Sequence, residues 1–360
     1  MKLFKVRLKF LALLFLTVLY VIFFPAASGK ELFLTPTWVT DVETTQVSRS
    51  VKNGEVFPFR LQRHLGYIDE QGKLLFREDI TYDAAIGPDF FVNYPAVPLH
   101  LVIRGQRGEF LGNISENGYP FVLGGDLYVI SPDGHSLSRV DKRGETLWKK
   151  TFASLITVAD KGKAGLVLGF LNGAFAVLSD DGTTLHEVPA GHEALSVALQ
   201  AGIADDALYF ACLVGGSPQR LKLYVKRDSS YELQFESALN STYRRAFIAR
   251  YFSEPDYFVF EQPGGAAVFQ VEKENLLFPL KLPGQLLSLA PTRPNGLFIC
   301  LSSSDRMHCE GFLPNGSRVF GFSYNAARPN TDDQYFLFSL GNSILLGEVS
   351  RLYFIRLEVL

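Results

Sequence analysis

The sequence contains little sulfur and little tryptophan. Among 360 residues there are two Met, two Trp and three Cys. Three cysteines are too few for a disulfide scaffold. None follows the N-terminal apolar run, so the lipid modification of a bacterial lipoprotein is not predicted. Cys300 and Cys309 flank a short connection, LSSSDRMH, and are expected to be either a disulfide or two buried thiols.

An excess of charge of one sign is also absent. The net charge is -2, and because residues 1–28 hold four basic side chains and no acidic one, the rest carries 31 basic against 37 acidic side chains. No basic block stands out, so a nucleic-acid partner is not expected. The sequence has no P-loop, dinucleotide-binding fingerprint or Gly-x-Ser-x-Gly nucleophile elbow. We therefore lean against an enzyme without excluding one.

Three groups of metal-ligand residue types occur, and each departs from a known metal-binding pattern. They are His186-Glu187 with His192-Glu193, His308 with Cys300 and Cys309, and Asp180-Asp181 with Asp205-Asp206. The first lacks the His-Glu-x-x-His spacing, the second lacks a fourth zinc ligand, and the third lacks the ladder of a calcium loop. We predict that the first group lies in a solvated loop between repeats, the second in the core of a hairpin, and the third in turns. We assign no metal, no cofactor and no catalytic residue.

The N-terminus has the pattern of an export signal. Four basic residues precede the apolar run at residues 10–24, and small residues follow as far as Ser28 and Gly29. As a helix this run would span about 22 Å, less than the roughly 30 Å core of a bilayer. Residues 1–28 are therefore predicted to be a signal peptide cleaved between Ser28 and Gly29, or an uncleaved membrane anchor. Either alternative places the rest of the chain in the periplasm, at the extracytoplasmic face of the membrane, or outside the cell.

The remaining sequence repeats one phrase. Seven segments read as strand, polar turn, strand, and successive copies lie 36 to 48 residues apart. Tight hairpin turns favour glycine because they need positive φ. The turn glycines are Gly72, Gly108, Gly144, Gly182 and Gly316, whereas Ser230 and Asn275 stand in the other two turns. Ser230 tolerates positive φ less well, so that hairpin is expected to use a longer loop. Such a period, with about four short strands per unit, is typical of a β-propeller.

We predict an all-β fold in which residues 37–360 form one propeller of four-stranded blades, after a linker at residues 29–36. Eight blades are expected, with seven as the alternative. Only three strands follow Ser323, so the last blade needs a fourth strand from elsewhere. The alternating segment Thr37–Ser48 is predicted to supply it and to close the ring, which removes open sheet edges.

The best preserved repeat, Asp126–Phe152, contains the strand LYVI, the turn glycine Gly144 and the pair Leu147-Trp148. These features resemble the repeat of pyrroloquinoline-quinone-like (quinoprotein-type) propellers, more closely than WD-repeat or kelch propellers. That superfamily contains quinone-dependent dehydrogenases and also non-catalytic scaffolds, such as the exported propeller of the outer-membrane β-barrel assembly machinery. The repeated Trp and the adjacent Cys pair of the enzymes are missing, so the resemblance implies the scaffold branch. Trp148 is predicted to pack between blades.

The predicted function is an exported, non-catalytic scaffold that binds envelope or membrane proteins, because a rigid ring with variable loops suits binding. If the signal is uncleaved, residues 10–24 would also contact the membrane. The alternative is a ligand-binding or hydrolytic propeller with a small-molecule or glycan site at the central channel. Carboxylates, His and Arg converging at the channel mouth would favour this alternative, whereas a plug of Val, Phe and Gly would count against it.

Overall fold

Strands form where the sequence is continuously apolar or alternates, and their burial follows their place in the blade. In the fourth blade the second strand, β14 (Gly165–Phe170), is buried along its whole length. The outermost strand, β16 (Thr184–Val188), is half-buried or exposed throughout. This gradient follows from the architecture, because inner strands are covered on both sides by neighbouring blades and outer strands face water.

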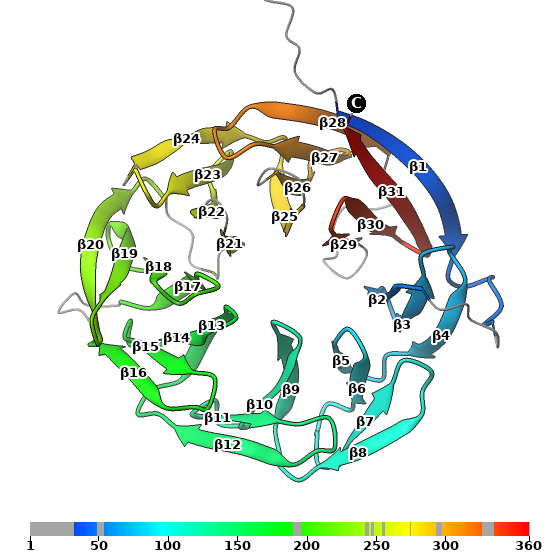
Figure 1. The fold of residues 1–360 in the computed structure, drawn as a ribbon, viewed down its shortest axis with the longest axis horizontal. Coiled ribbons are helices and arrows are strands. Elements are labelled where there is room, and N and C mark those ends of the chain that lie inside the picture. The colour runs from blue at the N-terminus through cyan, green and yellow to red at the C-terminus, as the bar shows by residue number, and fades with distance from the viewer. Residues whose placement is uncertain are drawn as a thin grey trace, which may run out of the picture.

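The computed structural model describes residues 32–48, 54–189, 196–241, 245, 248–253, 256–273, 275–292, 297–325 and 335–359. They form 31 strands in eight antiparallel sheets, arranged as blades around a central axis (Figure 1). Eight blades confirm the prediction and rule out seven. No helix within these ranges is long and apolar enough to cross a membrane.

The first four blades follow one another along the chain, each running from the centre of the ring outward. Their strands are β2 (Val56–Leu61), β3 (His64–Asp69) and β4 (Leu74–Asp79); β5 (Asp83–Ile86), β6 (Phe90–Tyr94), β7 (Leu101–Gly105) and β8 (Phe110–Ile114); β9 (Tyr119–Leu123), β10 (Asp126–Ile130), β11 (Ser136–Val140) and β12 (Thr146–Thr151); and β13 (Ile156–Lys161), β14, β15 (Phe175–Ser179) and β16. The first blade thus has three strands among the described residues, where four were expected.

The other four blades each contain four strands. They are β17 (Ala198–Ile203), β18 (Tyr209–Val214), β19 (Gln219–Arg227) and β20 (Ser230–Leu239); β21 (Ala249–Phe252), β22 (Tyr257–Gln262), β23 (Gly265–Gln270) and β24 (Asn275–Lys281); β25 (Gln285–Pro291), β26 (Phe298–Ser303), β27 (Met307–Phe312) and β28 (Arg318–Tyr324); and β29 (Tyr335–Leu340), β30 (Ser343–Glu348), β31 (Arg351–Val359) and β1 (Leu32–Asp41). The hairpin at Ser230 is tight, not extended as expected, because Arg227 pairs with Ser230 and Asp228 adopts a φ of 54°.

The N-terminal strand β1 closes the ring by pairing with the C-terminal strand β31. The register runs from Leu32 opposite Val359 to Asp41 opposite Arg351. Closure by an N-terminal strand is therefore confirmed, but the predicted boundaries, Thr37–Ser48, were wrong. The strand starts earlier and includes most of the segment assigned to a linker at residues 29–36, because β31 offers partners as far as Val359.

Neighbouring blades share the apolar core. One cluster joins Val167 and Phe175 of the fourth blade to Phe210 and Tyr224 of the fifth. Trp148 also packs between blades, as predicted: its Nε1 donates to the carbonyl of Asp180 in the next blade at 3.0 Å. Stability therefore comes mainly from contacts between successive repeats.

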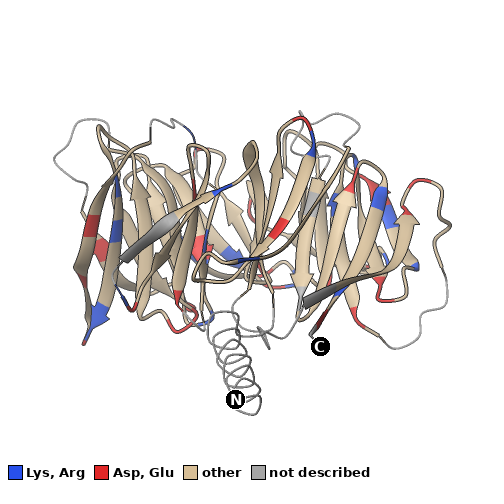
Figure 2. Ribbon diagram, turned by 90° about the horizontal axis from the view of Figure 1, so that it is seen from above, with Lys and Arg blue, Asp and Glu red and all other residues tan. Residues whose placement is uncertain are grey.

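Antiparallel order gives the ring two different faces, which Figure 2 shows edge-on. The hairpins between third and fourth strands lie on one face, which we call the turn face. The loops between second and third strands, and the links from one blade to the next, lie on the opposite face, which we call the loop face. All five turn glycines adopt positive φ, between 80° and 93°; they are Gly72, Gly108, Gly144, Gly182 and Gly316.

Candidate functional site

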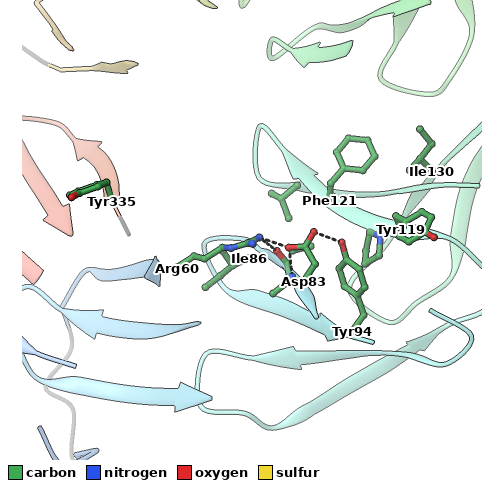
Figure 3. Close-up of a pocket in the computed structure, with 12 residues that line it drawn as sticks. Arg60, Asp83, Ile86, Tyr94, Tyr119, Phe121, Ile130 and Tyr335 are labelled. Atoms are coloured by element: carbon green, nitrogen blue, oxygen red, sulfur yellow. Dashed lines mark hydrogen bonds and ion pairs between the residues drawn. The ribbon is translucent and has the colours of Figure 1, made fainter. Parts of the chain in front are cut away.

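A pocket of about 570 Å³ opens near the centre of the ring, among strands of the first, second, third and eighth blades (Figure 3). Asp83, Tyr119 and Tyr335 line it and are the first residues of β5, β9 and β29. Tyr94 and Ile130 line it from the last positions of β6 and β10. Because innermost strands begin and second strands end on the loop face, these five residues lie at the loop-face end of this central pocket, while Ile86 and Val122 line it farther along β5 and β9.

The charged part of the pocket lining, which we call the polar floor, is an ion pair between Arg60 of the first blade and Asp83 of the second. Arg60 Nη1, from β2, lies 2.5 Å from Asp83 Oδ1 and also donates to the carbonyl of Ala84 at 3.1 Å. The hydroxyl of Tyr94 donates to Asp83 Oδ2 at 2.9 Å, and the backbone N–H of Ala84 donates to Oδ1 at 2.7 Å. The side chains of Arg60 and Asp83 are 34% and 40% exposed, so both remain accessible from the cavity.

The surroundings hold these groups in fixed protonation states. Burial would raise the pKa of Asp83, but hydrogen bonds from Ala84 N and Tyr94, together with Arg60, outweigh it and lower that pKa below its ordinary value. Burial and the hydrogen bond to Asp83 raise the pKa of Tyr94. At neutral pH the pocket therefore contains a carboxylate, a guanidinium and a protonated phenol.

Aromatic side chains surround this floor. The ring of Tyr119 is 37% exposed and meets the ring of Tyr94 edge-on, with centroids 6.5 Å apart and an interplanar angle of 60°. Phe121 lies beside Tyr119 on β9, and Tyr335 approaches from the other side of the pocket (Figure 3). The pocket thus combines one charge pair with an accessible aromatic surface.

This arrangement is better suited to binding than to catalysis. Among the described residues that line the pocket, Asp83 is the only carboxylate. Glycoside hydrolysis generally uses two carboxyl groups, one of them protonated, whereas Asp83 is held ionised. Arg60 and Asp83 nevertheless converge near the centre of the ring, which meets part of the criterion for a ligand site, since no His accompanies them among the described lining residues.

The loop face carries exposed apolar side chains in the second and fourth blades. Val97 and Leu99 lie in the loop between β6 and β7, and Tyr82 lies in the link that leads to Asp83. Leu155 and Leu171 occupy the link into the fourth blade and its β14–β15 loop. These five side chains are between 37% and 66% exposed. The central pocket and these residues together form the candidate functional site.

The structure places the predicted histidines differently from the expected loop. His186 and Glu187 lie in β16, and the His186 ring packs against Tyr231 of the next blade at 5.6 Å. This placement corrects the prediction, because the strand extends as far as Val188 before the chain leaves the sheet. His192-Glu193 lies outside the described residues, as do Ser28 and Gly29.

The acidic pairs lie in turns between strands. Asp181 accepts the N–H of Thr183 at 3.1 Å in the β15–β16 turn, while Asp180 accepts Arg139 at 2.6 Å and Lys161 at 2.9 Å. Asp205-Asp206 lies between β17 and β18. Within the described ranges, no group of three or more His, Cys, Asp and Glu residues is placed to hold a metal ion.

Cys300 and Cys309 are buried free thiols, so the predicted disulfide alternative is absent from the structure. They lie on the paired strands β26 and β27, but Cys300 is opposite Glu310 and Cys309 is opposite Leu301. A shift of one residue sends the two side chains to opposite faces of the sheet. His308 on β27 instead contacts Ser304 Oγ, with Nε2 at 3.2 Å.

No motif in the sequence indicated the pocket residues. Arg60, Asp83, Tyr94 and Tyr119 are spread over the first three blades and share no spacing. The one available signal is positional, because a charged or aromatic residue at the start of an innermost strand must lie at the centre of the ring. Using that signal requires strand boundaries accurate to one residue, which periodicity does not provide.

Comparisons with known proteins agree with this architecture. A family model described as a beta-propeller protein matches residues 1–351. An uncharacterized protein of Treponema pallidum (strain Nichols) is 24% identical over 283 residues, which cover 76% of this chain and 74% of that protein.

Two solved structures show the same fold. BamB from Moraxella catarrhalis, a quinoprotein-type propeller, aligns with a TM-score of 0.59 and 13% identity, over 90% of this chain and 100% of BamB. The computationally designed protein Ika8 aligns with a TM-score of 0.62 and 11% identity, over 89% of this chain and 99% of Ika8. At such identities the likeness extends to the fold alone.

Proposed function

We propose that this chain, which belongs to the beta-propeller family matched over residues 1–351, is an exported, non-catalytic scaffold that binds envelope or membrane proteins on its loop face. The observation that carries the proposal is the exposure of Tyr82, Val97, Leu99, Leu155 and Leu171 on that one face. Exposed apolar side chains on one face of a protein are typical of a protein-interaction surface.

The two faces of the ring differ in character, and this difference supports the assignment. The hairpins of the turn face are rich in charge, as in Asp141-Lys142-Arg143-Gly144-Glu145. The turn face also carries the hairpins between first and second strands, and in its described loops Leu208 is the large exposed hydrophobic residue, at 45% exposure. Phe110, Leu147 and Val319 are exposed as well, but they lie in the outermost strands β8, β12 and β28. A partner that buries apolar surface therefore gains more on the loop face than on the turn face.

The position of the N-terminal strand supports the same orientation. Strand β1 begins opposite Val359, the last residue of β31, at the turn face. An anchor formed by residues 10–24 would therefore join the ring at the turn face and leave the loop face pointing away from the membrane. A cleaved chain would present the same face freely in the periplasm. Sequencing the N-terminus of the mature protein distinguishes the two, since cleavage predicts a start at Gly29.

The proposal is tested by cross-linking and co-purification from envelope extracts with the full chain, comparing two variants. Val97→Asp combined with Leu99→Asp places two charges on the loop face, and we expect it to abolish recovery of a stoichiometric partner. Leu208→Asp, the matched control on the turn face, is expected to leave recovery unchanged. The proposal fails if the wild-type chain recovers no stoichiometric partner, or if the loop-face variant retains it.

The central pocket favours a second candidate function, the binding of a ligand. Arg60 and Asp83 converge there beside an exposed tyrosine, which supplies part of the set of carboxylates, His and Arg that the alternative formulated from the sequence required. A hydrolytic role receives no support from the lining, which offers a single, ionised carboxylate among its described residues.

A further inference from the structure

We propose that the central pocket binds a neutral, hydroxyl-rich ligand such as a short oligosaccharide, using the Arg60–Asp83 pair and the ring of Tyr119. The inference stands independently of the scaffold function. It rests on three properties of the pocket: the charge balance of its floor, the exposed aromatic ring, and the way Tyr94 joins the two.

The charge balance argues against an ionic ligand. Among the described residues that line the pocket, Arg60 and Asp83 are the charged ones, and at 2.5 Å their opposite charges offset each other. An anion drawn to the guanidinium would lie beside the carboxylate, and a cation drawn to the carboxylate would lie beside the guanidinium. Breaking the pair would also disturb the hydrogen bonds that both side chains make to the backbone of Ala84.

A wholly apolar ligand is also disfavoured. About a third of each charged side chain remains exposed in the cavity, so such a ligand would remove water from both groups without replacing its hydrogen bonds. A hydroxyl group both donates and accepts. Hydroxyls can therefore donate to the Asp83 carboxylate and accept from the Arg60 guanidinium without separating the pair. Neutral ligands with several hydroxyls meet this requirement best.

The exposed ring of Tyr119 provides a matching apolar surface. A sugar ring has polar edges and an apolar C–H face, and this face can stack on an aromatic ring whose π surface is electron-rich. The two recognition elements belong to one rigid unit, because Tyr94 contacts the ring of Tyr119 and holds Asp83 through its hydroxyl. Such preorganisation reduces the entropy lost on binding. The volume of about 570 Å³ suits a small ligand.

The test titrates the full chain with maltose, cellobiose and N,N′-diacetylchitobiose by calorimetry, up to about 10 mM, which detects a Kd near 1 mM. Acetate and tetramethylammonium serve as charged probes, and cyclohexanone serves as a weakly polar, neutral probe. We expect at least one disaccharide to bind more tightly than all three of these. We expect Tyr119→Ala to weaken that binding at least tenfold, and Asp83→Asn to weaken it as well.

Phe110→Ala is the matched control, because it removes an exposed aromatic side chain on the outermost strand β8 that does not line the pocket. It should leave sugar binding unchanged, and a thermal melt of each variant shows that it is folded. The inference is overturned if no disaccharide binds, if a charged or weakly polar probe binds more tightly, or if folded Tyr119→Ala binds as wild type. The Val97→Asp/Leu99→Asp variant should retain sugar binding, so this proposal and the scaffold proposal can fail separately.

Discussion

Replacing Trp38 by Ala tests how the ring is held closed. Trp38 lies in β1 and makes three contacts at the junction of the eighth and first blades. Its Nε1 donates to the carbonyl of Glu70 at 2.8 Å, and its ring stacks on Phe354 with centroids 5.2 Å apart and planes within 4°. The ring also covers Gly72, where an added Cβ would lie 2.7 Å from it.

The expected loss in the free energy of unfolding is the sum of the contributions of these contacts. The hydrogen bond contributes about 1 kcal/mol and the aromatic pair about 1 kcal/mol. Burial of part of the indole adds about 1 to 2 kcal/mol. The free energy of unfolding should therefore fall by about 3 kcal/mol, which corresponds to a decrease in Tm of roughly 4 to 5 °C, since a propeller spanning residues 32–359 has an unfolding entropy of about 0.7 kcal/mol/K.

Urea denaturation followed by near-ultraviolet circular dichroism measures the effect. Trp148→Ala is the informative comparison, since Trp148 donates to Asp180 and covers Gly182 in the same way, but inside the chain rather than at the closure. Both variants should lose similar stability, whereas only Trp38→Ala should make β1 sensitive to limited proteolysis. Val39→Ala, at the exposed neighbouring position, should change little. A loss below about 0.5 kcal/mol for Trp38→Ala would refute the reasoning.

Three further predictions concern the turns, the pocket and the thiols. Gly144→Ala should lower the free energy of unfolding, measured by denaturation, by about 2 kcal/mol more than Gly264→Ala does. Both positions have positive φ, but only at Gly144 would an added Cβ collide with a backbone carbonyl. Tyr94→Phe should raise the pKa of Asp83, observed by carboxyl NMR, because it removes one of the hydrogen bonds that lower that pKa. The lowered pKa stabilises the fold above about 3.9, and this stability is lost as pH falls toward the folded-state pKa, so in the variant the loss should be smaller and complete at a higher pH. Cys309, whose pKa burial raises to about 12, should resist alkylation in the native state, and mass spectrometry after unfolding should count three free thiols.

Much of the architecture could be predicted because it is written in local patterns. Gly144 and its equivalents recur at the same place in successive hairpins, and their positive φ is a local requirement of a tight turn. The shortage of one strand at the C-terminus likewise predicted closure by the N-terminus. The boundaries of β1 were wrong because alternation marks a strand without marking its ends, which the partner strand β31 decides.

The predictions from the sequence were wrong where the outcome depended on strand register or on the backbone conformation of one residue. Cys300 and Cys309 are separated by a short hairpin, yet an offset of one residue places them on opposite faces of the sheet. Ser230 follows a tight turn because Asp228 takes the positive φ instead. Neither outcome can be read from residue types, because both depend on how two strands align.

The sequence by itself determined the fold class, the number of blades and the closure of the ring, because strand periodicity and turn chemistry act over a few residues. Only the tertiary structure decided what lies at the centre. Arg60, Asp83, Tyr94 and Tyr119 come from three blades, and they meet because the ring brings the inner strands together. The same ring separates a charged turn face from an apolar loop face. A site assembled from distant repeats leaves no motif, since no two of its residues need a fixed spacing along the chain.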